Sequence, residues 1–153
     1  MLLLPTATYR AADFVSAAGA LGAEVVVASE RRQALARSMG DRALVVNLAR
    51  PEAAADAIVA LAGRVSAKGW SGVDGEGRSG VDGQSGVEGW SGVDAVVAVD
   101  DQGVMAASLA AQRLGLAHNP PEAVARSRDK VLMRTSLGAA GVPQPAWAVA
   151  RAC

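Results

Sequence analysis

Asp94-Ala-Val-Val-Ala-Val-Asp100 is the stretch that decides the fold of this chain. It is a short run of valine and alanine between two acidic residues, which is typical of a strand buried on both faces of a parallel sheet. A helix is predicted to follow over 102–114, because its apolar residues recur at helical spacing and Gly115 supplies a left-handed stop. A buried strand that leads directly into a helix is the repeating unit of an α/β fold.

The same unit occurs three times upstream. Strands are predicted over 2–4, 24–28 and 43–48, and each is followed by a helical pattern that ends at a glycine, namely Gly22, Gly40 and Gly63. The first helix has a clear apolar face, made of Ala11, Phe14, Val15, Ala18 and Leu21, while Ser29 is predicted to cap the second and Pro51 to open the third. This alternation predicts an α/β fold with an open, mostly parallel sheet of about four strands and helices on both faces.

The pattern fails over residues 66–93. Ser-Gly-Val recurs there at 71, 79, 85 and 91, and nine of the 17 glycines of the chain fall between Gly69 and Gly92. Ordering glycine is entropically costly, and each repeat offers one valine to bury, so we interpret the segment as a flexible low-complexity insertion. The string Gly75-Glu-Gly-Arg-Ser-Gly80 matches a dinucleotide fingerprint but neither follows a strand nor opens a helix, so it carries no weight.

Deletion of the repeat is expected to change stability little. The closure entropy of a loop changes by only about 0.6 kcal/mol for each doubling of its length. Equilibrium unfolding in urea checks this, and a cooperative collapse of the fold on deletion would show that the repeat belongs to the core.

Polar side chains near the predicted carboxyl ends of the strands are candidates for binding a ligand, since open α/β sheets bind ligands at that edge. Thr8 and Arg10 follow the first strand, and Asp100 and Asp101 follow the fourth. Thr8, Asp100 and Asp101 also have a structural interpretation, because Thr and Asp commonly cap helices at such positions. For Asp100 and Asp101, capping of the next helix is the favoured interpretation.

A second helix pair is predicted after Asn119-Pro-Pro-Glu122, with Asn119 as the cap. A break is expected near Ser127, and Lys130 falls in the first turn of the helix that follows and ends at Gly141. A cation gains no stabilisation from the positive end of a helix, so Lys130 is a candidate for binding an anion such as a phosphate. The alternative is that Lys130 is a solvated surface lysine.

The stretch from Leu114-Gly-Leu to Arg128-Asp-Lys130, continued into Ala140-Gly-Val-Pro-Gln-Pro145, resembles the junction of ATP-grasp ligases. In that superfamily such a sequence links a Rossmann-like N-terminal domain to the ATP-grasp domain. Residues 2–10 and 96–101 also look like that N-terminal domain, whereas the expanded insertion departs from the family pattern. The resemblance implies a domain over 1–127, followed over 128–153 by a linker helix and the start of a truncated ATP-grasp domain.

Function follows from the resemblance as an expectation. ATP-grasp enzymes use ATP and Mg²⁺ to activate a carboxylate as an acyl phosphate, which then reacts with an amine or a similar nucleophile. The family's phosphate-binding lysine falls on Lys130. Two alternatives remain open at this point: a stand-alone Rossmann-like module that binds a ligand without chemistry, and a non-functional remnant of a truncated gene.

Composition excludes several other classes. Fifteen basic and 15 acidic residues cancel, so there is no electrostatic footprint for nucleic acid or for an anionic membrane surface. His118 and Cys153 have no partners at ligand spacing, which argues against zinc or iron–sulfur sites, and His118 reads as an ordinary loop histidine. A lone cysteine and the absence of an export pattern at the N-terminus are compatible with the cytoplasm.

The chain by itself is expected to perform no ligation. In ATP-grasp enzymes the magnesium ligands belong to the domain after the junction, and only eight residues, none of them acidic, follow Pro145. ADP release from Mg-ATP with a panel of carboxylates and amines is the measurement. Turnover that is lost both on Lys130→Ala and on metal chelation would contradict this expectation.

Overall fold

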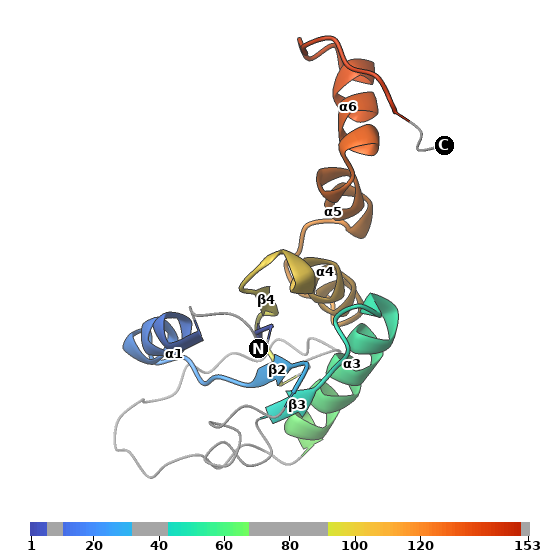
Figure 1. Ribbon diagram of the computed structural model, residues 1–153. Coiled ribbons are helices and arrows are strands. Elements are labelled where there is room, and N and C mark those ends of the chain that lie inside the picture. Colours follow the sequence, from blue (N-terminus) through green and yellow to red (C-terminus); the bar gives the residue numbers. More distant parts are fainter. Residues whose placement is uncertain (6–10, 32–42, 68–91, 151–153) are drawn as a thin grey trace, which may run out of the picture.

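The computed structural model describes residues 1–5, 11–31, 43–67 and 92–150 (Figure 1). The described residues contain four strands, β1 (Leu2–Leu3), β2 (Val27–Ser29), β3 (Ala43–Val45) and β4 (Val97–Ala98). All pairs are parallel, and the order across the sheet is β3-β2-β1-β4. The predicted α/β class with a parallel sheet of about four strands is confirmed.

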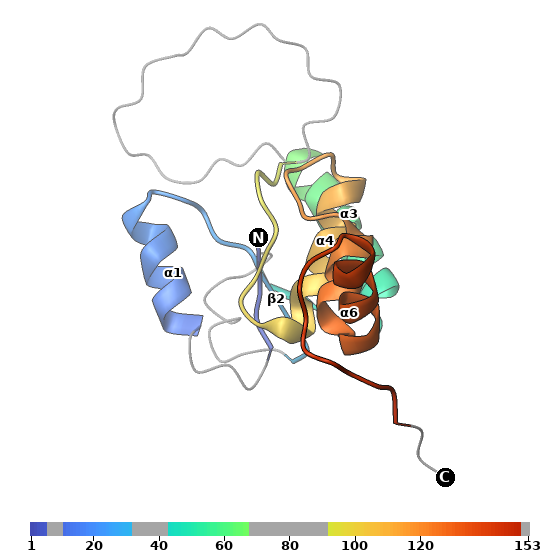
Figure 2. The ribbon, with the colours of Figure 1, turned by 90° about the horizontal axis from the view of Figure 1, so that it is seen from above.

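Helices lie on both sides of this sheet. Helix α1 (Ala11–Ala20) is on one side, and α3 (Pro51–Ala67) and α4 (Val104–Arg113) are together on the other (Figure 2). A short 3-10 helix, η2 (Asp101–Gly103), joins β4 to α4. Helices α5 (Pro121–Arg128) and α6 (Lys130–Ala139) then lead away from the sheet (Figure 1).

The hydrophobic core lies between the sheet and the α3–α4 pair. Leu3 and Ala28 of the central strands and Ile58 of α3 are each 0% exposed. Most other core positions of the two helices are alanines, namely Ala54, Ala55, Ala106, Ala107 and Ala110. Small side chains at these positions allow the helices and the sheet to approach each other closely.

The prediction that the strand within 94–100 is buried on both faces is wrong. Val97 is 42% exposed, and β4 pairs only with β1, so it forms one edge of the described sheet. A run of valine and alanine is apolar enough for a central strand, but the order of strands in the sheet decides its exposure.

Helix α1 agrees with expectation in part. Four residues of its predicted apolar face are half-buried, namely Ala11, Phe14, Val15 and Ala18, but none is fully buried. Leu21, the fifth, follows the helix and is 84% exposed. Among the described elements α1 lies alone on its side of the sheet (Figure 2). Most of the predicted second helix, including its stop at Gly40, falls in 32–42, outside the described residues.

Glycine stops were predicted correctly in part. Gly22, Gly115 and Gly141 follow helices and have φ values of 66°, 68° and 69°, in the left-handed region that glycine adopts without strain. Gly63 does not end its helix, because α3 continues to Ala67. Ser29 belongs to β2 and its hydroxyl donates to the carbonyl oxygen of Arg31, which is not the N-cap hydrogen bond expected of it.

The predicted insertion begins later and ends earlier than the range 66–93. Ser66 and Ala67 are the last residues of α3, and Val93 is only 6% exposed. The rest of the segment, 68–91, lies outside the described residues.

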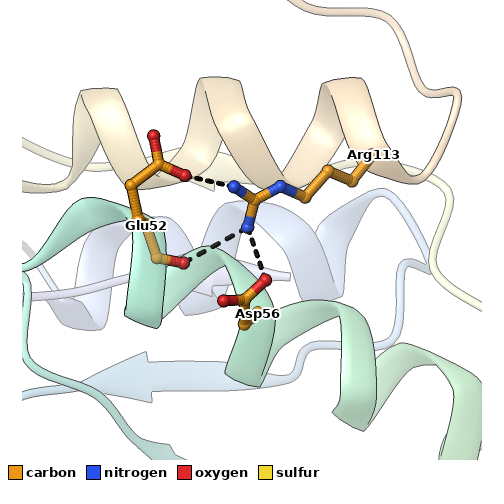
Figure 3. Close-up of polar contacts among 3 residues, drawn as sticks. All are labelled: Glu52, Asp56 and Arg113. Atoms are coloured by element: carbon orange, nitrogen blue, oxygen red, sulfur yellow. Dashed lines mark hydrogen bonds and ion pairs between the residues drawn. The ribbon is translucent and has the colours of Figure 1, made fainter.

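An ion-pair cluster joins α3 to α4 (Figure 3). Arg113, in the last turn of α4, lies 2.7 Å from the carboxylate of Asp56 and donates to the carbonyl oxygen of Glu52 at 3.2 Å. It also pairs with the Glu52 carboxylate. The two acidic side chains are 69% and 76% exposed, so each pair adds at most about 1 kcal/mol. The cluster helps to align α3 and α4 rather than supplying most of their stability.

The amino terminus of Met1 adjoins β4. It donates to the carbonyl oxygen of Ala95 at 2.6 Å, and the Met1 carbonyl accepts from the Val97 amide at 2.9 Å. Burial lowers the pKa of this amino group, and the nearby carboxylate of Asp94 opposes that shift.

Candidate functional site

The carboxyl ends of the four strands meet at one edge of the sheet, because all pairs are parallel. Asp100 and Asp101 lie at this edge, where the chain leaves β4 and enters η2, as predicted. Thr8 and Arg10, the other predicted candidates, lie outside the described residues, together with the rest of 6–10. The structure adds Ser29, which ends β2 at the same edge and is 4% exposed. The sequence interpretation treated Ser29 only as a cap, so it missed this position.

Asp100 caps the short helix that follows it. Its Oδ1 accepts from the Gln102 amide at 2.9 Å, and its backbone is extended, with φ −145° and ψ 179°. Such a bond satisfies one of the amides that a helix start leaves without an internal partner. The favoured capping role of Asp100 is therefore confirmed.

Asp101 contacts a residue far away in the sequence. Its Oδ2 lies 3.0 Å from a guanidinium nitrogen of Arg128, and its carbonyl oxygen accepts from the other terminal nitrogen of the same group. This pair was not predicted, because the two residues are 27 positions apart in the sequence and no local pattern connects them. The contact connects the carboxyl edge of the sheet to the end of α5.

The predicted break between the last two helices lies at Asp129, close to the expected position near Ser127. Asp129 is extended, with φ −108° and ψ 116°, and its Oδ1 accepts from the amides of Val131 and Leu132 at 2.7 and 2.9 Å. This carboxylate therefore caps α6. At the start of α5 the prediction was wrong: the N-cap is Pro120, and Asn119 uses its carbonyl oxygen to accept from the Ser108 hydroxyl.

Lys130 is the first residue of α6 and is exposed. Within the described ranges, no carboxylate forms an ion pair with its ammonium group. Asp129 is its nearest acidic neighbour in the sequence, but consecutive side chains on a helix do not face each other, and this one is engaged with the α6 amides.

A cleft of about 280 Å³ lies beside β4. Its walls are apolar and come from β4, α4 and Val124 of α5, and its polar groups are Ser108, His118 and Asn119. Ser108 is 5% exposed and donates to the Asn119 carbonyl oxygen at 2.6 Å. His118 is exposed, with Nδ1 2.8 Å from the Leu116 carbonyl oxygen, which agrees with the loop histidine expected from the sequence. A cleft of this size suits only a small ligand.

Neither a metal site nor a membrane span occurs among the described residues. No group of three or more His, Cys, Asp or Glu side chains there is arranged to hold a metal ion. No helix in those ranges has the length and apolar character needed to cross a membrane. Comparison with known proteins found no matching family model, no matching curated protein and no matching solved structure.

Proposed function

We propose that this chain is the N-terminal, Rossmann-like domain of an ATP-grasp ligase, together with the junction that leads into the ATP-grasp domain. The observation that carries the proposal is the exposed Lys130 at the first position of α6, directly after the helix break at Asp129. The parallel α/β sheet that precedes it is the fold that the sequence resemblance implies. In the cell we expect the protein in the cytoplasm, where ATP and Mg²⁺ are available.

The position of Lys130 is unfavourable for helix stability. A cation in the first turn opposes the positive end of the helix dipole, typically by about 0.3–1 kcal/mol at an exposed site. The neighbouring carboxylate of Asp129 is held by two backbone amides. An ammonium group in this setting attracts an anion from outside the chain, and a nucleotide phosphate is the anion that the proposed family supplies.

The proposed reaction has two steps. A substrate carboxylate oxygen attacks the terminal phosphorus of ATP, which releases ADP and forms an acyl phosphate. A nucleophile such as an amine then attacks the acyl carbon, and inorganic phosphate leaves. Mg²⁺, when bound, neutralises charge on the phosphates. Lys130 would hold a phosphate group, and Asp100, Asp101, Thr8 and Arg10 are the proposed contacts to substrate at the sheet edge.

Lys130→Ala is the direct test. In the natural protein, with any sequence that follows this chain, the substitution is expected to raise the ATP concentration for half-maximal ADP release about tenfold or more. A hydrogen bond to a charged group contributes roughly 1.5–3 kcal/mol, and about 1.4 kcal/mol corresponds to a factor of ten. Steady-state kinetics with varied ATP and saturating Mg²⁺ measures the change.

Arg126→Ala is the matched control, because Arg126 is an exposed cation on the preceding helix with no ion pair among the described residues. Arg126→Ala should leave the ATP concentration for half-maximal ADP release unchanged. Lys130→Arg, which keeps the positive charge, should raise that concentration less than Lys130→Ala does. If Lys130→Ala behaves like Arg126→Ala, Lys130 is a solvated surface residue and the proposal loses its main support.

A second candidate function is a stand-alone module that binds a small ligand without catalysis. The cleft beside β4, with buried Ser108 and exposed His118, is the observation that favours it. Ala117→Phe would fill the cleft from an exposed position of its wall, outside the core. Loss of ligand binding in this variant, with ATP binding unaffected by Lys130→Ala, would favour the module over the ligase domain.

A further inference from the structure

The end of β4 holds η2 firmly against the sheet. Gly103 is buried, and a Cβ atom added to it would lie 3.2 Å from the Cβ of Ala98 and 3.3 Å from the Cβ of Leu3. The backbone of η2 therefore approaches β4 and β1 so closely that a side chain at this position would require the strands or η2 to shift by a few tenths of an ångström. As a result, Asp101, the first residue of η2, has a defined place at the carboxyl edge of the sheet.

The guanidinium group of Arg128 contacts Asp101 at two acceptor atoms. One terminal nitrogen lies 3.0 Å from Oδ2 of Asp101, and the other donates to the Asp101 carbonyl oxygen. A planar guanidinium that binds two acceptors at once fixes direction as well as distance, which a lysine ammonium does not do. The contact thus orients the last turn of α5 with respect to η2.

The rest of α5 is held at its other end. Val124 is 4% exposed, and the Ser108 hydroxyl of α4 donates to the carbonyl oxygen of Asn119, just before α5 begins. These contacts fix the beginning and middle of α5, whereas the Arg128–Asp101 contact fixes its end. Asp129 follows at once as the cap of α6, and Lys130 is the next residue.

We propose that Arg128 is a positioning residue, which sets the direction of α6 and the place of Lys130 relative to the carboxyl edge of the sheet. The effect on ATP rests on the function proposed above, but the effect on helix direction does not. Arg128 is not proposed to contact ATP or the substrate itself. It acts through the single extended residue, Asp129, that separates it from Lys130.

The direction of α6 can be measured in the full chain with two spin labels. Gln112 on α4 and Ala139 at the end of α6 are both exposed, and Cys153→Ser removes the native thiol. The parent is expected to give one narrow label-to-label distance distribution, and Arg128→Met a broadened or shifted one. Arg126→Met, which removes an equivalent exposed cation from the same helix, should reproduce the parent.

Asp101→Asn is a second variant that keeps the backbone carbonyl acceptor, so it should broaden the distribution less than Arg128→Met. It also protects the test if Arg128→Met does not fold. Distributions identical to the parent in both Arg128→Met and Asp101→Asn would overturn the positioning role.

The ATP measurement separates this inference from the proposed function. Arg128→Met is expected to raise the ATP concentration for half-maximal turnover roughly two- to five-fold, because an exposed ion pair contributes up to about 1 kcal/mol. The maximal rate should change less. Broadened distances without any dependence on ATP would support positioning and contradict the ligase assignment. An ATP dependence that requires Lys130 but ignores Arg128→Met, with unchanged distances, would contradict positioning alone.

Discussion

Ile58→Ala is expected to lower the free energy of unfolding by about 2–5 kcal/mol, the usual cost of removing a large aliphatic side chain from a packed core. Ile58 is 0% exposed and is the largest fully buried side chain of α3. Its neighbours in the core are mostly alanines, whose side chains are too short to extend into the space it would leave. Urea denaturation followed by circular dichroism gives the change.

Two substitutions on the same helix calibrate this result. Ile58→Val should cost only about 0.5–1.5 kcal/mol, since it removes one methyl group. Val59→Ala, at the neighbouring half-buried position, should cost less than Ile58→Ala. A loss below about 1 kcal/mol for Ile58→Ala would mean that the core between α3 and the sheet is loosely packed.

Gly103→Val is expected to destabilise the fold by about 1–3 kcal/mol or more through overpacking. The φ of Gly103 is −85°, which valine can adopt, so the cost is steric rather than conformational. The atoms that a new side chain would meet are the Cβ atoms of Ala98 and Leu3, which are fixed to the two strand backbones and cannot rotate away.

Gly63→Ala is the matched control for the glycine substitution. Gly63 lies inside α3, and a Cβ added there meets nothing within 4 Å. Alanine should stabilise this helix position by about 0.5–1 kcal/mol. Equilibrium unfolding should therefore move in opposite directions for the two variants. A neutral Gly103→Val would show that η2 can move away from the sheet.

The α/β class was predictable because its signals are local. Apolar runs such as 94–100, helical spacing in 51–62 and glycine after a helix are each written within a few residues. The exposure of whole helices and strands was not predicted correctly. Val97 is exposed because β4 is at an edge of the described sheet, and Leu21 because no described element covers it, and neither fact is encoded in the nearby sequence.

In the candidate site, too, features with a local signal were predicted and a contact between distant residues was not. Asp100 and Lys130 were predicted in place because capping and the helix dipole act over one turn. The contact between Arg128 and Asp101 was not predicted, since it depends on the path of the chain through α4 and α5. Thr8 and Arg10 stay predictions, because they lie outside the described residues.

The alanine-rich contact between α3 and α4 has a thermal consequence. An alanine side chain loses no rotamer freedom when it is buried, so bringing Ala55 and Ala110 into the core costs backbone entropy alone. It also removes little apolar area from water, and the heat capacity of unfolding scales with that area. For a globular protein this quantity is about 12–15 cal/mol/K per residue, and a core of small side chains lowers it. The stability of this domain should accordingly vary less steeply with temperature on either side of its maximum than that of a domain built on leucine and phenylalanine.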